Sequence, residues 1–327
     1  MEEQERTENT EHAEPELLYH YTDQEGLLGI LGGDRKNIWA THFRYLNDTS
    51  EGKFVFDSLI DEISRNYQLP KEWSDFFGIS KGPALDGDQS VDASTIEAGI
   101  SAGVWATSAT VFITSFSAKG DSISQWRAYS GPSGGFSVGF KSGYLRAIGE
   151  EFLRGREDRF MTSDVLIRCE YYEGDKKTLF QRQVGSAVAA YITQASSKPG
   201  PEATGKSKIA QRLQPIAMAH FAPLSIYIAK LKHAGFSDES EWRLGFHLMP
   251  NSIPSDVSIR PGKSTLVPYL EIPLSVPEPF SAIGIDQIIV GPCPHPEESR
   301  KSVEMFLNRS GFRGVQVKNS VIPYRNW

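Results

Sequence analysis

Cysteine is scarce and long apolar runs are missing. The 327 residues include only Cys169 and Cys293, which cannot supply a disulfide framework or a cysteine-rich zinc site. No apolar run approaches the roughly 18–20 residues of a membrane-spanning helix, and the N-terminus has no apolar segment typical of a secretory signal. We therefore expect a soluble, cytoplasmic protein that does not bind membranes.

Sequence patterns of several enzyme classes are also missing. The seven histidines are scattered, with no His-x-x-x-His or His-Glu-x-x-His pattern, and we expect no Gly-x-Ser-x-Gly nucleophile elbow. Cys293 and His295 are two ligand types, but a tetrahedral metal site needs three or four. The glycine-rich residues 130–135 precede a predicted strand, whereas a phosphate-binding loop precedes a helix. We expect neither a metal site nor a nucleotide-binding loop here.

The negative charge of the chain lies mainly in a tail. Lys and Arg number 34 against 41 Asp and Glu, which gives a net charge of −7. Residues 1–16 hold seven glutamates and one arginine, a net −6, so residues 17–327 sum to −1. Such a glutamate-rich segment cannot bury enough apolar surface to offset its ordering entropy. We predict that residues 1–16 are disordered.

Residues 17–327 are predicted to form one α+β domain. Hydrophobic residues make up 39% of the chain and aromatic residues 11%, enough for a sizeable core. Apolar patterning and turn residues predict strands over 17–22, 38–41, 111–116, 136–140, 165–172, 242–248, 285–290 and 314–318. They predict helices over 26–31, about 50–63, 178–195, 206–233 and 296–309. We interpret residues 176–234 as a helical insertion.

The insertion carries a basic segment. Residues 198–233 have a net charge of +5, which either orients an anionic partner or forms a solvated helix face. Nucleic-acid contacts, if the protein makes any, are expected at its six basic residues. These are Lys198, Lys206, Lys208, Arg212, Lys230 and Lys232.

The first of three places where polar residues meet extended backbone is residues 20–22. Side chains alternate along a strand, so His20 and Thr22 share one face and Tyr21 lies on the other. A histidine beside a hydroxyl group can orient a ligand. The alternative is a structural histidine.

The second place combines the strand at residues 114–117 with the segment 124–129. Alternation puts Ser115 and Ser117 on one strand face. Trp126 and Tyr129 are three residues apart, so on a helical turn they lie together and offer a flat surface to an aromatic ring. Core packing of the two rings is the alternative.

The third place is residues 239–243. Glu239, Glu241 and Arg243 share one strand face, opposite Trp242 and Leu244. This pattern is either a surface ion pair or a carboxylate aimed into a cleft, where it can support cationic charge on a sugar.

Several motifs together resemble the prokaryotic domain-of-unknown-function 2971 family over residues 17–325. The motifs lie in residues 17–31, 39–41, 44–48, 114–117, 124–129, 241–243 and 289–292. His20-x-Thr22, followed by a short helix and Gly32, is also similar to the start of ADP-ribosyltransferases. The resemblance implies an ADP-ribosyltransferase-like split antiparallel or mixed β-sheet with flanking helices, to which the helical insertion is added.

The resemblance also implies roles for individual residues. His20, Tyr21 and Thr22 would bind NAD, and Glu241 would be the catalytic carboxylate, with Glu239 helping to select the acceptor. Either Trp126 or Tyr129 would stack on nicotinamide beside Ser115. Either Arg44 or Arg127 would bind the pyrophosphate in a bidentate manner.

The implied activity is a metal-independent transfer of ADP-ribose from NAD to a macromolecule, nucleic acid or protein. The protein would then be a bacterial toxin-like or antiphage defence effector, with a possible antitoxin or partner subunit. Breaking the ribose–nicotinamide bond builds oxocarbenium-like charge, which a carboxylate stabilises more in the transition state than in the ground state. The alternatives are a non-catalytic ligand-binding or sensor module and a metal-independent nuclease or hydrolase.

Overall fold

The computed structural model describes residues 13–46, 111–131, 134–161, 164–172, 177–197, 215–216, 219–220, 222–249, 256–262 and 264–325. The predicted helix over 50–63 and the basic residues Lys198, Lys206, Lys208 and Arg212 lie outside these ranges. Of the predicted tail, residues 13–16 lie within the described ranges. Glu14 pairs with Arg146 at 2.5 Å, and the Ser142 N–H donates to the Glu16 carbonyl at 3.0 Å.

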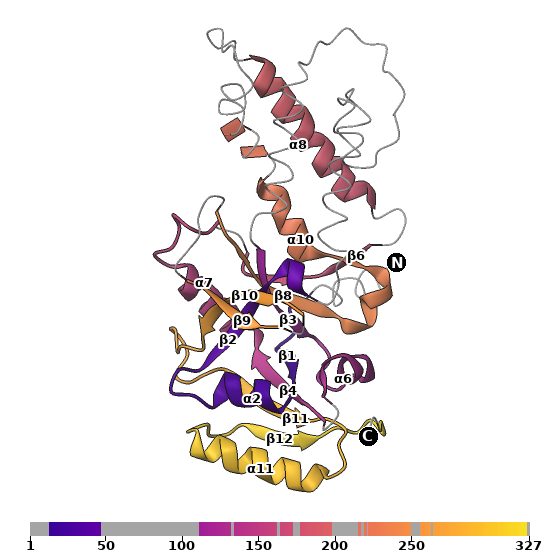
Figure 1. The fold of residues 1–327 in the computed structure, drawn as a ribbon, viewed down its shortest axis with the longest axis vertical. Helices are drawn as coiled ribbons and strands as arrows, with labels where there is room; N and C mark the ends of the chain where they lie inside the picture. Colours follow the sequence, from indigo (N-terminus) through magenta and orange to yellow (C-terminus); the bar gives the residue numbers. More distant parts are fainter. Residues whose placement is uncertain are drawn as a thin grey trace, which may run out of the picture.

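The fold is α+β, with a mixed sheet and helices on its faces (Figure 1). The strands follow the order β12-β11-β4-β1-β3-β2-β10-β9, and β8 pairs with both β3 and β5. Their bounds are β1 Leu17–Thr22, β2 Asn37–His42, β3 Val111–Ser117, β4 Phe136–Lys141, β5 Leu166–Arg168, β8 Glu241–His247, β9 Val257–Pro261, β10 Leu266–Pro273, β11 Ile285–Val290 and β12 Gln316–Asn319. Most pairs are antiparallel, whereas β11 and β12 are parallel.

The helices are α2 Gln24–Leu31, α6 Ile123–Tyr129, α7 Ser142–Leu153, α8 Lys177–Ser197, α10 Ile226–Lys230 and α11 Pro296–Arg309. Three 3₁₀ segments are η1 Phe43–Tyr45, η3 Ala222–Ser225 and η4 Ala234–Glu239. A separate two-stranded parallel pair joins β6 Glu170–Tyr172 to β7 Leu231–His233. No helix among the described residues is long and apolar enough to cross a membrane.

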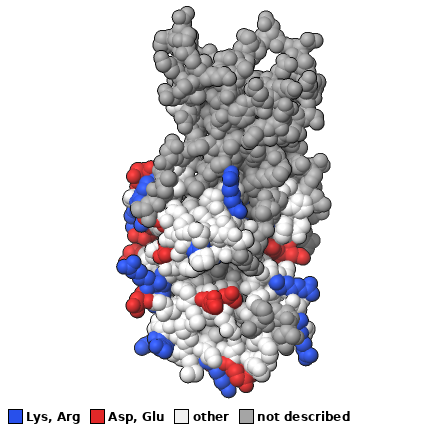
Figure 2. All heavy atoms as spheres, viewed as in Figure 1, with Lys and Arg blue, Asp and Glu red and all other residues white. Residues whose placement is uncertain are grey.

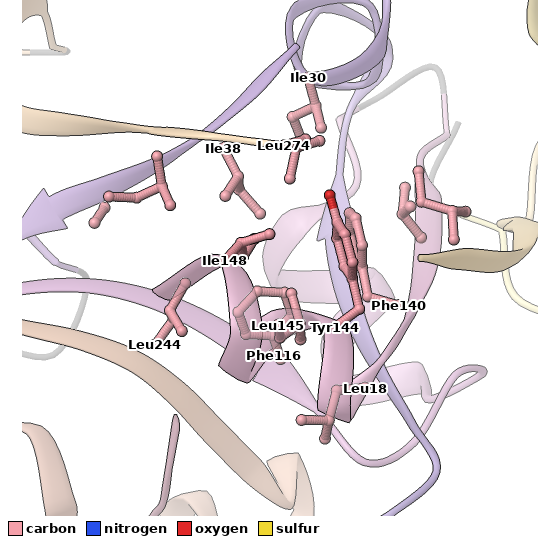
Figure 3. Close-up of a cluster of buried hydrophobic side chains, with 14 of the residues drawn as sticks. Leu18, Ile30, Ile38, Phe116, Phe140, Tyr144, Leu145, Ile148, Leu244 and Leu274 are labelled. Carbon is pink, nitrogen blue, oxygen red and sulfur yellow. The ribbon is translucent and has the colours of Figure 1, made fainter. Parts of the chain in front are cut away.

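The main core lies between the sheet and α7. Even-numbered residues of β1, β3, β4 and β8 point toward it because paired strands keep their alternating side chains in register. Figure 3 shows Tyr144, Leu145 and Ile148 of α7 close to Phe116 and Phe140. On the opposite face of the sheet, α10 packs against β8 and β3, and α6 packs against β1.

The best predicted elements carry clear local signals. The Asp23 side chain caps α2 by accepting from the Gly26 N–H at 2.8 Å, as an aspartate before a helix predicts. Pro296 stands at the first position of α11 and Gly311 follows its end with φ +82°. The predicted terminal strand–helix–strand unit is confirmed by β11, α11 and β12.

Other predictions are wrong in detail. The predicted single strand 165–172 is two strands, because the Cys169 N–H turns to the Glu241 carbonyl at 2.9 Å. The predicted helix 206–233 cannot be helical throughout, since α10 ends at Lys230 and β7 begins at the next residue. No strand is predicted over β9 or β10, although both belong to the main sheet.

Candidate functional site

A buried group of charged side chains lies where β8 begins. The Lys232 ammonium is 2.5 Å from Oε2 of Glu241 and 2.7 Å from Oε2 of Glu239. Arg243 donates from Nε to Oε1 of Glu241 at 2.8 Å and from Nη2 to Oε2 at 3.3 Å. We call these four residues the glutamate cluster. Glu241 and Lys232 are each 4% exposed and Arg243 is 1% exposed.

Charges within the glutamate cluster stabilise one another. Loss of solvation on burial would raise the pKa of Glu241, but Arg243 and Lys232 attract and hydrogen-bond the carboxylate, which lowers the pKa to about 2. Burial alone would lower the pKa of Lys232, yet Glu241 and Glu239 raise it above its ordinary value. Glu241 is therefore a carboxylate and Lys232 an ammonium across the physiological pH range.

The backbone around the two glutamates is fixed by its neighbours. Ser240, between them, is in the left-handed region at φ +46°, which is unfavourable for a residue with a side chain. The Ser117 hydroxyl donates to the Glu239 carbonyl at 2.6 Å, and the Ala118 N–H donates to the Ser240 carbonyl at 3.0 Å. The Glu241 N–H donates to the Tyr171 hydroxyl at 2.7 Å. Hydrogen bonds with β3, with the residue after it and with Tyr171 therefore hold the strained turn before, at and after Ser240.

The glutamate cluster also connects the sheet to α10 and β7. Arg243 Nη1 donates to the carbonyl oxygens of Ile228 and Ala229, each at 3.3 Å. Lys232 belongs to β7, and η4 then leads to Glu239. Consequently, Arg243 and Lys232 hold α10 and β7 against β8.

Only one of the two predicted stacking aromatics has an accessible ring. Trp126 is 0% exposed, packs edge-on against Tyr21 at 4.6 Å and donates from Nε1 to Asp121 at 2.6 Å. Its ring therefore has no free face for nicotinamide. Tyr129 is half-buried, and burial raises its pKa to about 12, with further contributions from the charges of Glu239 and Glu241. Tyr129 is therefore the aromatic that lies near the glutamate cluster.

His20 does not share a face of the sheet with Glu241. Tyr19 pairs with Ser117, and Ser117 pairs with Glu241, so these three side chains point the same way. His20 points to the other face, where its ring lies 5.7 Å from that of Phe116. His20 and Glu241 therefore lie on opposite faces of the sheet, because strand register decides the face.

β1 and β2 pair with opposite ends of β3, and the stretch of β3 between them, next to His20, has no strand partner on that edge among the described residues. Both strands pair with the same edge of β3, β1 at Ser117 and β2 at Phe112 and Ile113. Between these points side chains replace the ladder: His20 Nδ1 donates to the Ser115 carbonyl at 3.0 Å, and the Thr114 hydroxyl donates to the Trp39 carbonyl at 2.9 Å. Burial lowers the pKa of His20, although its bond to Ser115 opposes the shift.

Four further residues that were predicted to bind the cofactor lie outside the glutamate cluster. Thr22 packs against the first turn of α2, where a Cβ atom on Gly26 would lie 1.9 Å from its hydroxyl. The Tyr21 hydroxyl donates to the Lys119 carbonyl at 2.7 Å. Arg44 is exposed in η1, near the opposite end of β3 from Ser117. Arg127 is exposed and lies 5.4 Å over the Tyr324 ring. None of these four contributes a described contact to the glutamate cluster.

Sequence reasoning missed Tyr171 and misplaced Lys232. Glu241 and Arg243 do share a strand face, as predicted, but they are buried and not a surface pair. Lys232 was expected at a nucleic-acid surface, whereas it is buried, and Lys230 pairs with Glu170 at 2.8 Å. Lys232 and Tyr171 carry no sequence signal because their segments are joined to Glu241 only through tertiary packing.

Within the described residues, no group of three or more His, Cys, Asp or Glu side chains could hold a metal ion. A hollow of about 690 Å³ lies between α2 and α11, and its lining includes Leu27, Phe136, Cys293, His295 and Val303. None of the predicted site residues lines this hollow.

Comparison with known proteins gives one match. Residues 125–244 match a family described as "Protein of unknown function (DUF2971)". No curated protein and no solved structure matches the chain. The matched segment runs from α6 through the first residues of β8, so it contains Tyr129 and the entire glutamate cluster. This match supports the resemblance to the domain-of-unknown-function 2971 family, whose description carries no function.

Proposed function

We propose that this chain is an ADP-ribosyltransferase that uses NAD, with the glutamate cluster at its reactive end. The observation that carries the proposal is the placement of Glu239 and Glu241 on either side of the strained Ser240, with α6, the helix that carries Tyr129, packed against η4. Strained backbone at a charged cluster is a recurrent property of functional sites. The acceptor would be a macromolecule, as in a toxin-like or antiphage effector.

The reaction would divide between the two glutamates. As the bond from ribose C1′ to nicotinamide breaks, its electron pair leaves with nicotinamide and positive charge develops on the ribose. The ionised Glu241 would stabilise this charge, and Lys232 and Arg243 would keep its carboxylate in place. Glu239, whose side chain is 15% exposed, would accept the proton of the attacking acceptor hydroxyl and pass it to solvent.

Nicotinamide release from NAD tests this proposal. Glu241→Gln is expected to abolish release while NAD binding persists, and Glu239→Gln to lower transfer to an acceptor more than hydrolysis by water. Glu150→Gln, at an exposed position of α7, is the matched control and should release nicotinamide at the wild-type rate. Thermal unfolding of each variant separates loss of chemistry from loss of fold. Equal release by wild type and Glu241→Gln would contradict the assignment.

A second function, ligand binding without turnover, is favoured by the burial of Glu241. Both of its oxygens already accept hydrogen bonds from cations, and His20 lies on the other face of the sheet. A sensor module would bind NAD and release no nicotinamide from wild type. The same assay therefore decides between the two functions.

A further inference from the structure

An indole ring and a guanidinium group lie together on the surface of β2, β10 and β9. Along β2, Ile38 and Ala40 are buried while Trp39 is 43% exposed. Thr41 pairs with Tyr269, and Trp39 pairs with Glu271, so all four side chains share one face of the sheet. This face is distinct from the core side, which Ile38 and Ala40 occupy.

Arg260 reaches this face from the edge strand β9. Its guanidinium lies 5.5 Å from the centre of the Trp39 ring, and Nη2 donates to the Thr41 hydroxyl at 3.4 Å. The Tyr269 ring lies 4.6 Å from that of Trp39, tilted by 43°. The Nε–H of Arg260 is buried and has no acceptor among the described residues. A buried donor without a partner is rare in folded proteins.

We infer that Trp39 and Arg260 bind the base and phosphate of a nucleotide. The open part of the indole offers a surface on which a base can stack, and stacking on an aromatic side chain tolerates any base. A phosphate oxygen would accept from the terminal nitrogens of the Arg260 guanidinium, since a guanidinium matches phosphate geometry. Glu271, exposed beside Trp39, can accept from a ribose hydroxyl.

A lone exposed tryptophan is ordinary and would carry no such inference. Here the ring is held on one side by Tyr269 and accompanied by a cation with an unsatisfied buried donor. The inference rests on the proposed function only in naming NAD as the nucleotide. The register supports that choice, because Thr41 pairs with Ile113 and Ile113 with Gly245, which puts Trp39 on the same face as Glu241.

Calorimetric titration with AMP and with NAD tests the site. Wild type should bind both, and Trp39→Leu and Arg260→Gln should each weaken both about tenfold or more, the fold-change expected for losing one stacked base or one phosphate contact. Trp39→Phe retains an aromatic ring and should stay within about threefold of wild type. Ile259→Ala is the control, because Ile259 adjoins Arg260 on β9 and is 55% exposed. Thermal unfolding confirms that each variant folds.

The outcomes separate this inference from the proposed function. Unchanged affinity in both Trp39→Leu and Arg260→Gln, or no binding of either nucleotide by wild type, overturns the inference. Weakened AMP binding in the variants, without nicotinamide release from wild type, supports the nucleotide site and contradicts the transferase. If Trp39→Leu releases nicotinamide with an unaltered KM for NAD, the proposed transferase activity stands and the nucleotide site at Trp39 is overturned.

Discussion

Lys232 and Glu241 form a buried ion pair, with the ammonium 2.5 Å from Oε2 and the two side chains 6% and 4% exposed. Arg243 completes the charge balance from the other side of the carboxylate. A carboxylate buried between two cations stabilises the folded state only while it is ionised, and stability therefore becomes dependent on pH.

The first prediction concerns acid unfolding. The pKa of Glu241 is lowered from its ordinary value of 4.5 to about 2, so its contribution is complete above pH 4.5 and disappears as the pH falls toward 2. A shift of this size corresponds to roughly 3 kcal/mol. Urea unfolding between pH 2 and 6 should show a shallower loss of stability for Glu241→Gln than for wild type. Identical pH profiles would contradict the buried carboxylate, and Glu150→Gln should retain the wild-type profile.

The second prediction compares two glycines of α2. A Cβ atom on Gly26 would lie 1.9 Å from the Thr22 hydroxyl, whereas nothing lies within 4 Å of one on Gly29. Gly26→Ala should therefore lower the free energy of unfolding by about 1–3 kcal/mol through overpacking. Gly29→Ala should raise it by about 0.5–1 kcal/mol, because alanine favours the helix. Denaturant unfolding measures both, and equal effects would show that Thr22 does not contact the helix.

The third prediction concerns the backbone strain at Ser240. Its φ of +46° costs a residue with a side chain about 1 kcal/mol or more, and glycine avoids that cost. Ser240→Gly should leave stability unchanged or slightly higher, while Ser240→Val should lower it by more than 1 kcal/mol. The same pair of substitutions at exposed Ser237 provides the comparison. If chemical unfolding shows Ser240→Gly to be less stable than Ser240→Val, the backbone at Ser240 is not strained.

The fourth prediction concerns the chain end. Asp121 accepts from the Trp126 indole at 2.6 Å, the Ser320 hydroxyl at 2.6 Å and the Val321 N–H at 2.9 Å. Asp121→Ala should lower the free energy of unfolding by about 1–3 kcal/mol, because the buried indole donor loses its acceptor. It should also speed amide exchange at Val321.

Amide exchange measured by mass spectrometry checks the effect on Val321, with Asp34→Ala as an exposed control. Asp121→Asn retains one acceptor oxygen and should be intermediate. Unaltered exchange at Val321 in Asp121→Ala would show that another contact holds the segment.

Local signals allowed much of the fold to be predicted. The cap at Asp23, the proline and glycine around α11 and the alternation in β4 and β8 each act within a few residues. In contrast, β10 contains Pro268, which argues against a central strand. It is tolerated because pairing with β2 begins only at Tyr269, so the missing N–H of Pro268 faces no partner there.

The site was harder to predict because strand pairing decides which residues of different strands share a face of the sheet. Alternation correctly grouped Glu241 with Arg243, but it could not reveal that Tyr19 pairs with Ser117 and thereby turns His20 away. Spacing grouped Trp126 with Tyr129 and gave no measure of which ring is buried. The basic composition of residues 198–233 likewise suggested an exposed position for Lys232, although Lys232 is buried and pairs with Glu241 of β8.

The strand order interleaves strands that lie far apart in the sequence. β4 lies between β1 and β11, and β2 lies between β3 and β10, so early strands depend on neighbours encoded more than a hundred residues later. During synthesis, the N-terminal strands would leave the ribosome with open edges until Leu266–Val290 follows. Such distant pairing makes folding slow and late. A nascent chain of this protein would therefore stay exposed to chaperones and to misassociation until residues 266–290 have been synthesised.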